Sequence, residues 1–166
     1  MALLNDQGQP IADRWQVAAE GEAVTSPETI LPLARFLAAR AGTPEMAGDE
    51  LARGVALGAD ARPERLREVL DRIDLVAIDF PKFRDGRGFT IARTLREHMG
   101  YEGEIRARGH VLPDQFVMLL DCGFTTVEAP EDRPIAPWAE FLVLQPHGPE
   151  PARPVQLFRR LVSGRA

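Results

Sequence analysis

The stretch DLVAIDFPKFRDGRGFTIARTLRE, residues 74–97, decides the fold class. It begins with a nearly continuous apolar run, which is typical of a strand buried on both faces of a parallel sheet. A turn with two glycines follows, and from Phe89 onward the apolar residues recur at helical spacing. Because a buried strand, a short turn and a helix form the repeating unit of α/β proteins, this stretch predicts a parallel sheet.

The same unit recurs on both sides of this stretch. Further strands are expected at 29–31, 54–58, 104–109 and 124–129, and helices at 32–42, 63–73, 89–99 and 112–123. This alternation predicts an open, mostly parallel sheet of four or five strands with helices on both faces. A partial barrel of the TIM type is the alternative, because so few strands cannot close an eight-stranded barrel.

Three regions follow from these patterns. Residues 1–28 are polar and lack a clear period, so they are expected to form an N-terminal arm or a small hairpin. Residues 29–130 form the α/β domain. Residues 131–166 are expected to form a proline-rich extension with short helices, one of them at 137–145, whose apolar stripe from Val155 packs on the domain or on a partner.

Composition excludes several classes of protein. With 166 residues, 45% hydrophobic and 27% charged, the chain is an ordinary globular domain, and its net charge of −5 disfavours nucleic acid as a partner. No apolar stretch reaches the length of a membrane span and no signal peptide is visible, so a cytoplasmic protein is expected. Cys122 is the only cysteine and the three histidines lack metal-ligand spacing, so no metal site and no cofactor is evident.

The turn that follows the strand at residues 74–80 is a candidate anion site. Gly86 and Gly88 are expected to adopt positive φ and to let the backbone approach a ligand. The helix that follows begins with unpaired N–H groups, and Lys82 and Arg87 could add charge-assisted hydrogen bonds. The alternative is a purely structural turn, in which the Asp85 side chain hydrogen-bonds its own backbone.

The next strand carries an unusual polar face. Glu104, Arg106 and Arg108 alternate onto one side, which indicates either an edge strand or a polar site. Asp79, at the end of the preceding strand, is expected to pair with one of the two arginines. The candidate ligand-binding residues are therefore Lys82, Asp85, Gly86, Arg87, Gly88, Arg106 and Arg108, and the candidate acid or base is Asp79 or Asp114.

Three segments, DFPKFRDGRGFTIARTLRE (79–97), GYEGEIRARGHVLPDQ (100–115) and CGF (122–124), also carry a resemblance. Together they resemble a bacterial family of unknown function, whose genes commonly lie beside assimilatory sulfite reductase. Members are often described as oxidoreductases involved in sulfite reduction. The resemblance covers roughly residues 29–146 and implies a role in sulfur assimilation, with sulfite reductase as a partner. His110 and Pro113 depart from the family pattern, which usually has aspartate and arginine there.

Three functions remain open at this point. The chain has no cysteine pair and no dinucleotide-binding motif, so the first is a non-redox accessory or anion-binding protein linked to assimilatory sulfite reduction. The second is an enzyme acting on a phosphorylated or sulfated small molecule. The third is a structural or homodimerisation module, because the helix around residues 116–120 is apolar nearly all round.

Overall fold

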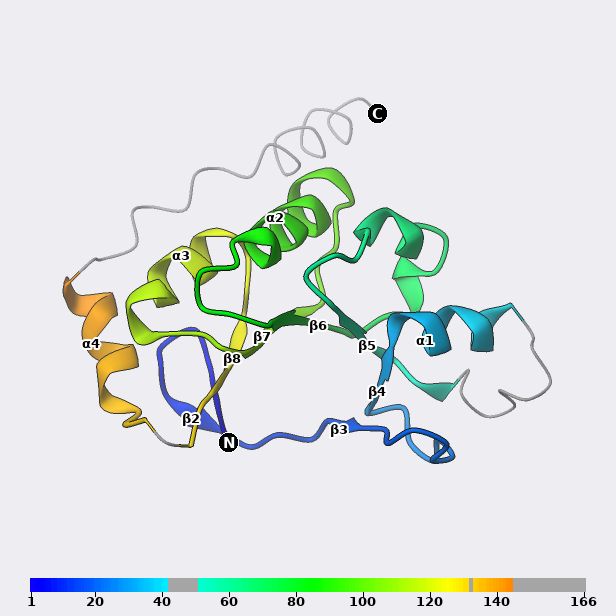
Figure 1. Cartoon of the computed structure of the whole chain (residues 1–166), viewed down its shortest axis with the longest axis horizontal. Helices are drawn as coiled ribbons and strands as arrows, with labels where there is room; N and C mark the ends of the chain where they lie inside the picture. The colour runs from blue at the N-terminus through cyan, green and yellow to red at the C-terminus, as the bar shows by residue number, and fades with distance from the viewer. Residues whose placement is uncertain (42–50, 132, 145–166) are drawn as a thin grey trace, which may run out of the picture.

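The computed structural model describes residues 1–41, 51–131 and 133–144. Its described part is built on one eight-stranded sheet in the order β2-β1-β8-β7-β6-β5-β4-β3, curled into a half-barrel (Figure 1). The strands are β1 (Ala2–Leu4), β2 (Pro10–Ile11), β3 (Gln16–Val17), β4 (Thr29–Pro32), β5 (Gly54–Leu57), β6 (Leu75–Phe80), β7 (Glu104–Gly109) and β8 (Thr126–Ala129). All neighbours from β3 to β8 pair in parallel, whereas β1 pairs antiparallel with both β8 and β2.

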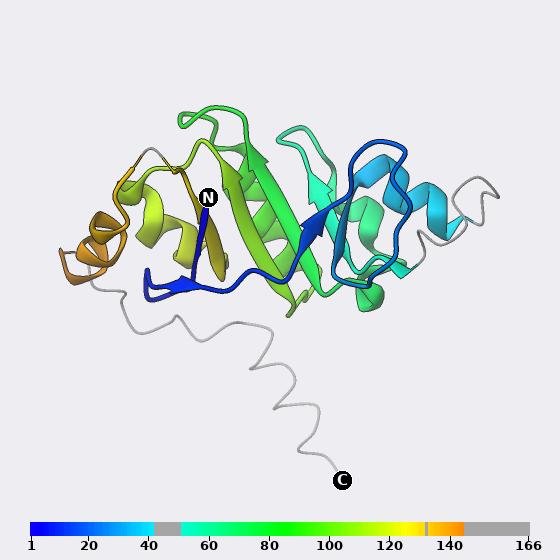
Figure 2. The ribbon, with the colours of Figure 1, turned by 90° about the horizontal axis from the view of Figure 1, so that it is seen from below.

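The α/β class and the mostly parallel sheet are confirmed, but the expected number of strands is wrong. The strands that the sequence pattern missed, β1, β2 and β3, have only two or three residues each, too few to show a period. β1 and β2 form the small hairpin at one edge of the sheet, and β3 lies at the opposite edge. The segment between β2 and β3 therefore crosses the sheet (Figure 2).

Helices on both faces were expected, and this too is wrong. α1 (Leu33–Arg40), α2 (Arg87–Arg93) and α3 (Phe116–Asp121) all lie on the same, convex side of the sheet (Figure 1). The strand order explains the difference. From β4 to β8 each strand lies beside the previous one, and right-handed crossovers that never reverse direction place every helix on the same side. The partial barrel is thus the better of the two expected architectures.

Other helical predictions are met in part. The expected helix at 63–73 is two 3₁₀ turns, Pro63–Leu66 and Leu70–Arg72, and a third such turn, Pro113–Gln115, leads into α3. α2 continues as a π-helical turn, Thr94–His98. The helix expected at 137–145 is α4 (Ala136–Leu144), whereas the apolar stripe expected from Val155 lies outside the described residues.

The apolar residues of α3 are partly explained within the chain. Phe116 and Leu119 are buried, and the Phe116 ring packs edge-on against Trp138 of α4 with ring centroids 5.4 Å apart. Homodimerisation through this helix stays a prediction. None of the described helices is both long enough and apolar enough to cross a membrane.

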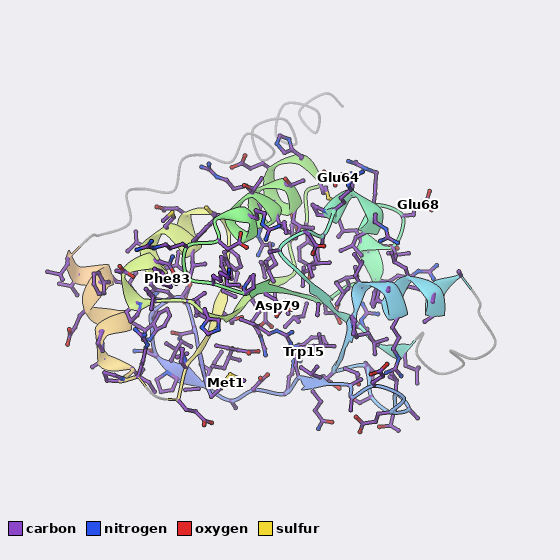
Figure 3. All side chains as sticks on the ribbon, viewed as in Figure 1. Met1, Trp15, Glu64, Glu68, Asp79 and Phe83 are labelled. Atoms are coloured by element: carbon purple, nitrogen blue, oxygen red, sulfur yellow. The ribbon has the colours of Figure 1, made fainter. Side chains whose placement is uncertain are left out.

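The two faces of the sheet bury different cores. On β6, Val76, Ile78 and Phe80 point toward the helices and belong to the main core. The alternate residues Leu75 and Ala77 point to the concave face and pack with Trp15 of the crossing segment (Figure 3). Trp15 therefore covers the concave face over β4 to β6 and leaves that of β7 for polar residues.

Close packing beneath Trp15 depends on a glycine of β5. A Cβ at Gly54 would lie 3.0 Å from the Trp15 ring and 2.9 Å from the Ile30 side chain. Glycine at this position lets the crossing segment sit directly on the sheet.

Candidate functional site

Charged residues gather on the concave face along β7 and its neighbours. Glu104, Arg106 and Arg108 of β7 share this face, as the alternation predicted. In register beside them lie Asp79 of β6, next to Arg108, and Thr126 of β8, next to Arg106. β7 lies between β6 and β8, so the choice between an edge strand and a polar site is decided for the polar site.

Arg106 is fully enclosed by acidic partners. Only 1% of it is exposed, and its Nη1 and Nη2 donate to the two carboxylate oxygens of Asp13 at 2.8 and 3.0 Å. Nε and Nη2 donate to Glu104 at 3.1 and 3.0 Å, and Nη1 donates to Glu128 at 3.4 Å. Thr126 Oγ1 donates to Glu104 at 2.6 Å. An arginine has five N–H donors, and all five have acceptors here, so Arg106 holds the crossing segment through Asp13.

This enclosed group, Arg106 with Asp13, Glu104 and Glu128, is called the buried charge cluster below. Burial raises the pKa of Glu128 above its ordinary value, against the opposing charges of Arg108 and Arg106. Burial also acts to lower the pKa of Arg106, but its bonds to Asp13 and the charge of Glu104 outweigh that effect and raise it. The cluster thus combines one cation with three carboxylates, one of which resists ionisation.

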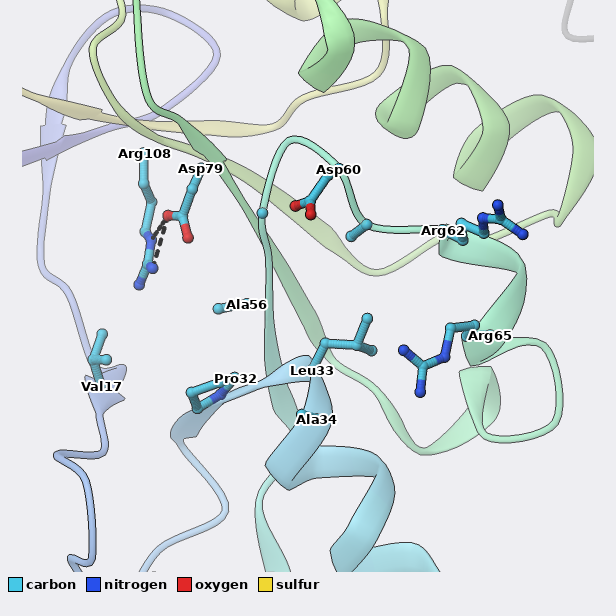
Figure 4. Close-up of a pocket in the computed structure, with 12 residues that line it drawn as sticks. Val17, Pro32, Leu33, Ala34, Ala56, Asp60, Arg62, Arg65, Asp79 and Arg108 are labelled. Atoms are coloured by element: carbon cyan, nitrogen blue, oxygen red, sulfur yellow. Dashed lines mark hydrogen bonds and ion pairs between the residues drawn. The ribbon is translucent and has the colours of Figure 1, made fainter.

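Arg108, two residues further along β7, faces an open cavity of about 530 Å³ (Figure 4). Its Nε and Nη2 both lie 2.8 Å from Asp79 Oδ1, so the predicted pairing of Asp79 with one of the two arginines is confirmed. The Arg108 side chain is 15% exposed and that of Asp79 is 41% exposed. Among the described residues, Arg108 Nη1 and Asp79 Oδ2 have no hydrogen-bond partner, so both are available to a ligand.

The cavity lies at the carboxyl ends of four parallel strands, the edge at which α/β sheets bind ligands. Its lining residues come from β3, from the carboxyl ends of β4 to β7 and from the segments that follow β4 and β5: Val17, Pro32, Leu33, Ala34, Ala56, Gly58, Asp60, Ala61, Arg62, Arg65, Asp79 and Arg108. In Figure 4 the Arg65 guanidinium points from the first 3₁₀ turn toward Leu33, whereas that of Arg62 points away. Within the described part of the chain, neither arginine forms an ion pair.

The glycine turn has a different geometry from the one expected. Gly86 has φ of −77°, and neither Gly86 nor Gly88 has positive φ, so that expectation is wrong. A Cβ at Gly88 would lie 2.5 Å from the Phe80 ring, so this glycine lets α2 pack closely on β6. Arg87 bonds Asp85 through Nε at 2.9 Å and Nη2 at 2.6 Å, and this hydrogen bond lowers the Asp85 pKa to about 2.

The remaining predicted residues lie on loops outside the cavity lining. Lys82, His110 and Asp114 are exposed, and the His110 backbone N–H donates to the Phe80 carbonyl at 2.8 Å. An anion cradle at the glycine turn and an acid–base role for Asp114 stay predictions. Sequence reasoning missed Arg65 because it lies on the polar face of the helix expected at 63–73, and it did not consider Asp60, which precedes that helix. Their position directly after β5, at the same sheet edge as Asp79 and Arg108, was the available signal.

Comparison with known proteins places the chain in a family. No curated protein and no solved structure is significantly similar to it. The family model described as "Bacterial protein of unknown function (DUF934)" matches residues 54–145, which is more than half of the chain. The matched region includes Arg65, Asp79 and both arginines of β7, whereas Asp13 and Trp15 of the crossing segment lie before it. The chain belongs to the DUF934 family of bacterial proteins.

Proposed function

We propose that the protein is a non-redox accessory protein that binds a small anionic ligand in the concave cavity. One observation carries the proposal: Arg108 and Arg65, from two different elements, both line a cavity at the carboxyl ends of parallel strands. Arg108 keeps Nη1 available, and Arg65 has no ion-pair partner within the described residues. A guanidinium with unoccupied donors is the group that proteins use most often for carboxylates and other planar or tetrahedral oxyanions.

The charge balance of the lining supports an anion. Because Arg62 points away, two cations, Arg65 and Arg108, balance two carboxylates, Asp60 and Asp79, in a chain whose net charge is −5. A cavity without net negative charge repels an anion less than the rest of this acidic surface does. The buried charge cluster contributes no donor to this cavity, because every N–H of Arg106 is already bonded.

The pathway rests on the resemblance rather than on the cavity. The family that the sequence resembles has genes that commonly lie beside assimilatory sulfite reductase. We therefore propose sulfite reductase as the protein partner, and sulfur oxyanions as the first ligands to test. Co-purification of the tagged full chain with sulfite reductase tests the partner. The expected result is a complex at micromolar concentrations, and its absence there contradicts this part of the proposal.

Ligand binding is tested by thermal unfolding with sulfate, sulfite, phosphate and adenine nucleotides, with sodium chloride at matched ionic strength as the reference. A ligand at 100 times its dissociation constant stabilises the folded state by roughly 2.7 kcal/mol, which raises the unfolding midpoint measurably. We expect a selective rise that Arg65→Ala abolishes. Arg67→Ala is the matched control, because Arg67 is an exposed arginine that follows the same 3₁₀ turn and does not line the cavity. An equal rise in wild type and Arg65→Ala contradicts the proposal.

A second candidate function rests on the free oxygen of Asp79. With Arg108 bound to Oδ1, Oδ2 is free to exchange a proton with a ligand in the cavity, as a general acid or base would. An enzyme that acts on a phosphorylated or sulfated small molecule would use Asp79 in this way. Asp79→Asn is then expected to abolish turnover of nitrophenyl phosphate or nitrophenyl sulfate, and the absence of turnover by the wild type contradicts this candidate.

A further inference from the structure

The size of the cavity sets a limit on what fills it. Organic ligands occupy protein sites of roughly 300 to 1,000 Å³, and the volume of about 530 Å³ lies inside that range. A water molecule accounts for about 30 Å³ of liquid, so an oxyanion with four oxygens, about the size of four waters, fills on the order of a fifth of such a cavity. An inorganic oxyanion bound at Arg108 would therefore leave most of the lining in contact with water.

The rest of the lining is apolar. In Figure 4 Asp79, Asp60 and Arg108 lie on one side, and Pro32, Leu33 and Ala56 lie on the other, next to Val17. The apolar lining residues are Val17, Pro32, Leu33, Ala34, Ala56 and Ala61. Val17 is 56% exposed, although it belongs to a strand of the sheet. Apolar side chains that gather at an open concavity, rather than in the core, mark a surface that an apolar group covers.

The polar side of the cavity presents both kinds of hydrogen-bonding group. Arg108 Nη1 and the Arg65 guanidinium offer donors to an anion, and Asp79 Oδ2 offers an acceptor to a hydroxyl or amino group. In Figure 4 Arg108 and Asp79 lie together at the carboxyl ends of the strands, whereas the Arg65 guanidinium lies across the cavity, beside Leu33 of the apolar wall. The ligand that matches this arrangement has a charged head and a separate hydrocarbon part.

We infer that the natural ligand is an organic anion, with a negatively charged head held by Arg65 and a body of several carbons lying on the neighbouring Pro32, Leu33 and Ala34 wall. This inference rests on the proposed function, because it specifies the ligand class of the same cavity. It excludes inorganic sulfite, sulfate or phosphate as the tightest ligand. Organic sulfonates, sulfate esters and carboxylates share the chemistry that the cavity requires.

A series of alkyl sulfonates tests the ligand class with the head group held constant. Binding of methanesulfonate, propanesulfonate and hexanesulfonate to the full chain is measured by calorimetry, with sulfate and sodium chloride as references at equal ionic strength. Each methylene that the wall covers is expected to raise the affinity about fourfold until the wall is full. Sulfate is expected to bind more weakly than hexanesulfonate.

Two variants separate the wall from the anion head. Ala34→Phe fills the wall from an exposed position in the first turn of α1 and should remove the dependence on chain length while methanesulfonate still binds. Ala41→Phe, at the other end of the same helix and outside the lining, is the control and should behave as wild type. Arg65→Ala should weaken every member of the series.

The outcomes distinguish the two proposals. Equal affinities across the series, or sulfate as the tightest ligand, with binding still lost in Arg65→Ala, overturn the organic ligand and leave the anion-binding function standing. An Ala34→Phe protein that keeps the full dependence on chain length places the hydrocarbon elsewhere and also overturns the inference. Absence of any Arg65-dependent binding overturns the proposed function together with it.

Discussion

Arg106 and Arg108 lie on the same face of the same strand, yet their surroundings differ in kind. Arg106 is 1% exposed and is bonded to three carboxylates, one of which comes from the crossing segment 93 residues away. Arg108 is paired with a single carboxylate and opens onto the cavity. The difference shows that alternation along a strand determines only the face of a charged residue. The segment that covers that face determines whether the residue stabilises the fold or remains available to a ligand.

The largest loss of folding stability is expected for Arg106→Met. It leaves the largely buried Glu104 and Glu128, and the more exposed Asp13, without their cation, and loss of one partner from a buried ion pair costs roughly 3 to 5 kcal/mol. Arg108→Met removes only a partly exposed pair and should cost about 1 kcal/mol. Urea unfolding monitored by Trp fluorescence measures both.

A partial rescue separates lost charge balance from lost packing. Adding Glu104→Gln to Arg106→Met removes one of the uncompensated charges and is expected to recover part of the stability. Equal losses for Arg106→Met and Arg108→Met would show that the two arginines have the same structural role, contrary to the comparison.

The same two arginines show how much of this site the sequence predicts. Asp79 could be assigned in advance to one of the two arginines, because parallel strands that follow each other in sequence place residues near their carboxyl ends side by side. Asp13 could not be assigned to Arg106, because it belongs to a segment between strands of two residues, which carry no period. Contacts this distant in sequence depend on how the whole chain folds.

The same limit explains the errors in the fold. Periodicity identified the buried strands and most helices, but the order of strands in a sheet leaves no trace in local hydrophobic spacing. Helices on one face or on two therefore fit the same pattern. Arg65 was overlooked for a related reason: an exposed arginine near a predicted helix looks the same in sequence whether it faces bulk water or a cavity.

A smaller change in folding stability is expected for Glu128→Gln. Glu128 interacts electrostatically with both Arg106 and Arg108, so this variant probes both regions. Burial raises the Glu128 pKa above its ordinary 4.5, so between that value and the raised pKa the folded state binds more protons than the unfolded state. The contribution of Glu128 to stability is therefore present at low pH and falls as pH rises through this window. Glutamine does not titrate and keeps an acceptor oxygen for Arg106.

The free energy of unfolding of Glu128→Gln should accordingly fall less than that of the wild type as the pH rises above about 4.5. At pH 7 the variant is expected to be as stable as the wild type or more stable. Urea unfolding at several pH values checks this, with the exposed Glu68→Gln as the control. Parallel pH profiles for Glu128→Gln and wild type would show that the carboxyl ionises normally in the fold.

The smallest effect is expected for Arg87→Ala, at the turn where sequence alone places the anion. The Arg87 side chain is 60% exposed and bonds only its neighbour Asp85 among the described residues, so the unfolding midpoint should not change measurably. Without the hydrogen bond from Arg87, the pKa of Asp85 should rise from about 2 toward its ordinary 3.8, which carboxyl resonances in an NMR titration report.

Anion binding should persist in Arg87→Ala, because the turn does not line the cavity. If Arg87→Ala instead loses the ligand-induced rise in midpoint while Arg65→Ala keeps it, the ligand binds at the glycine turn. Arg108 would then be, like Arg106, a residue of the scaffold.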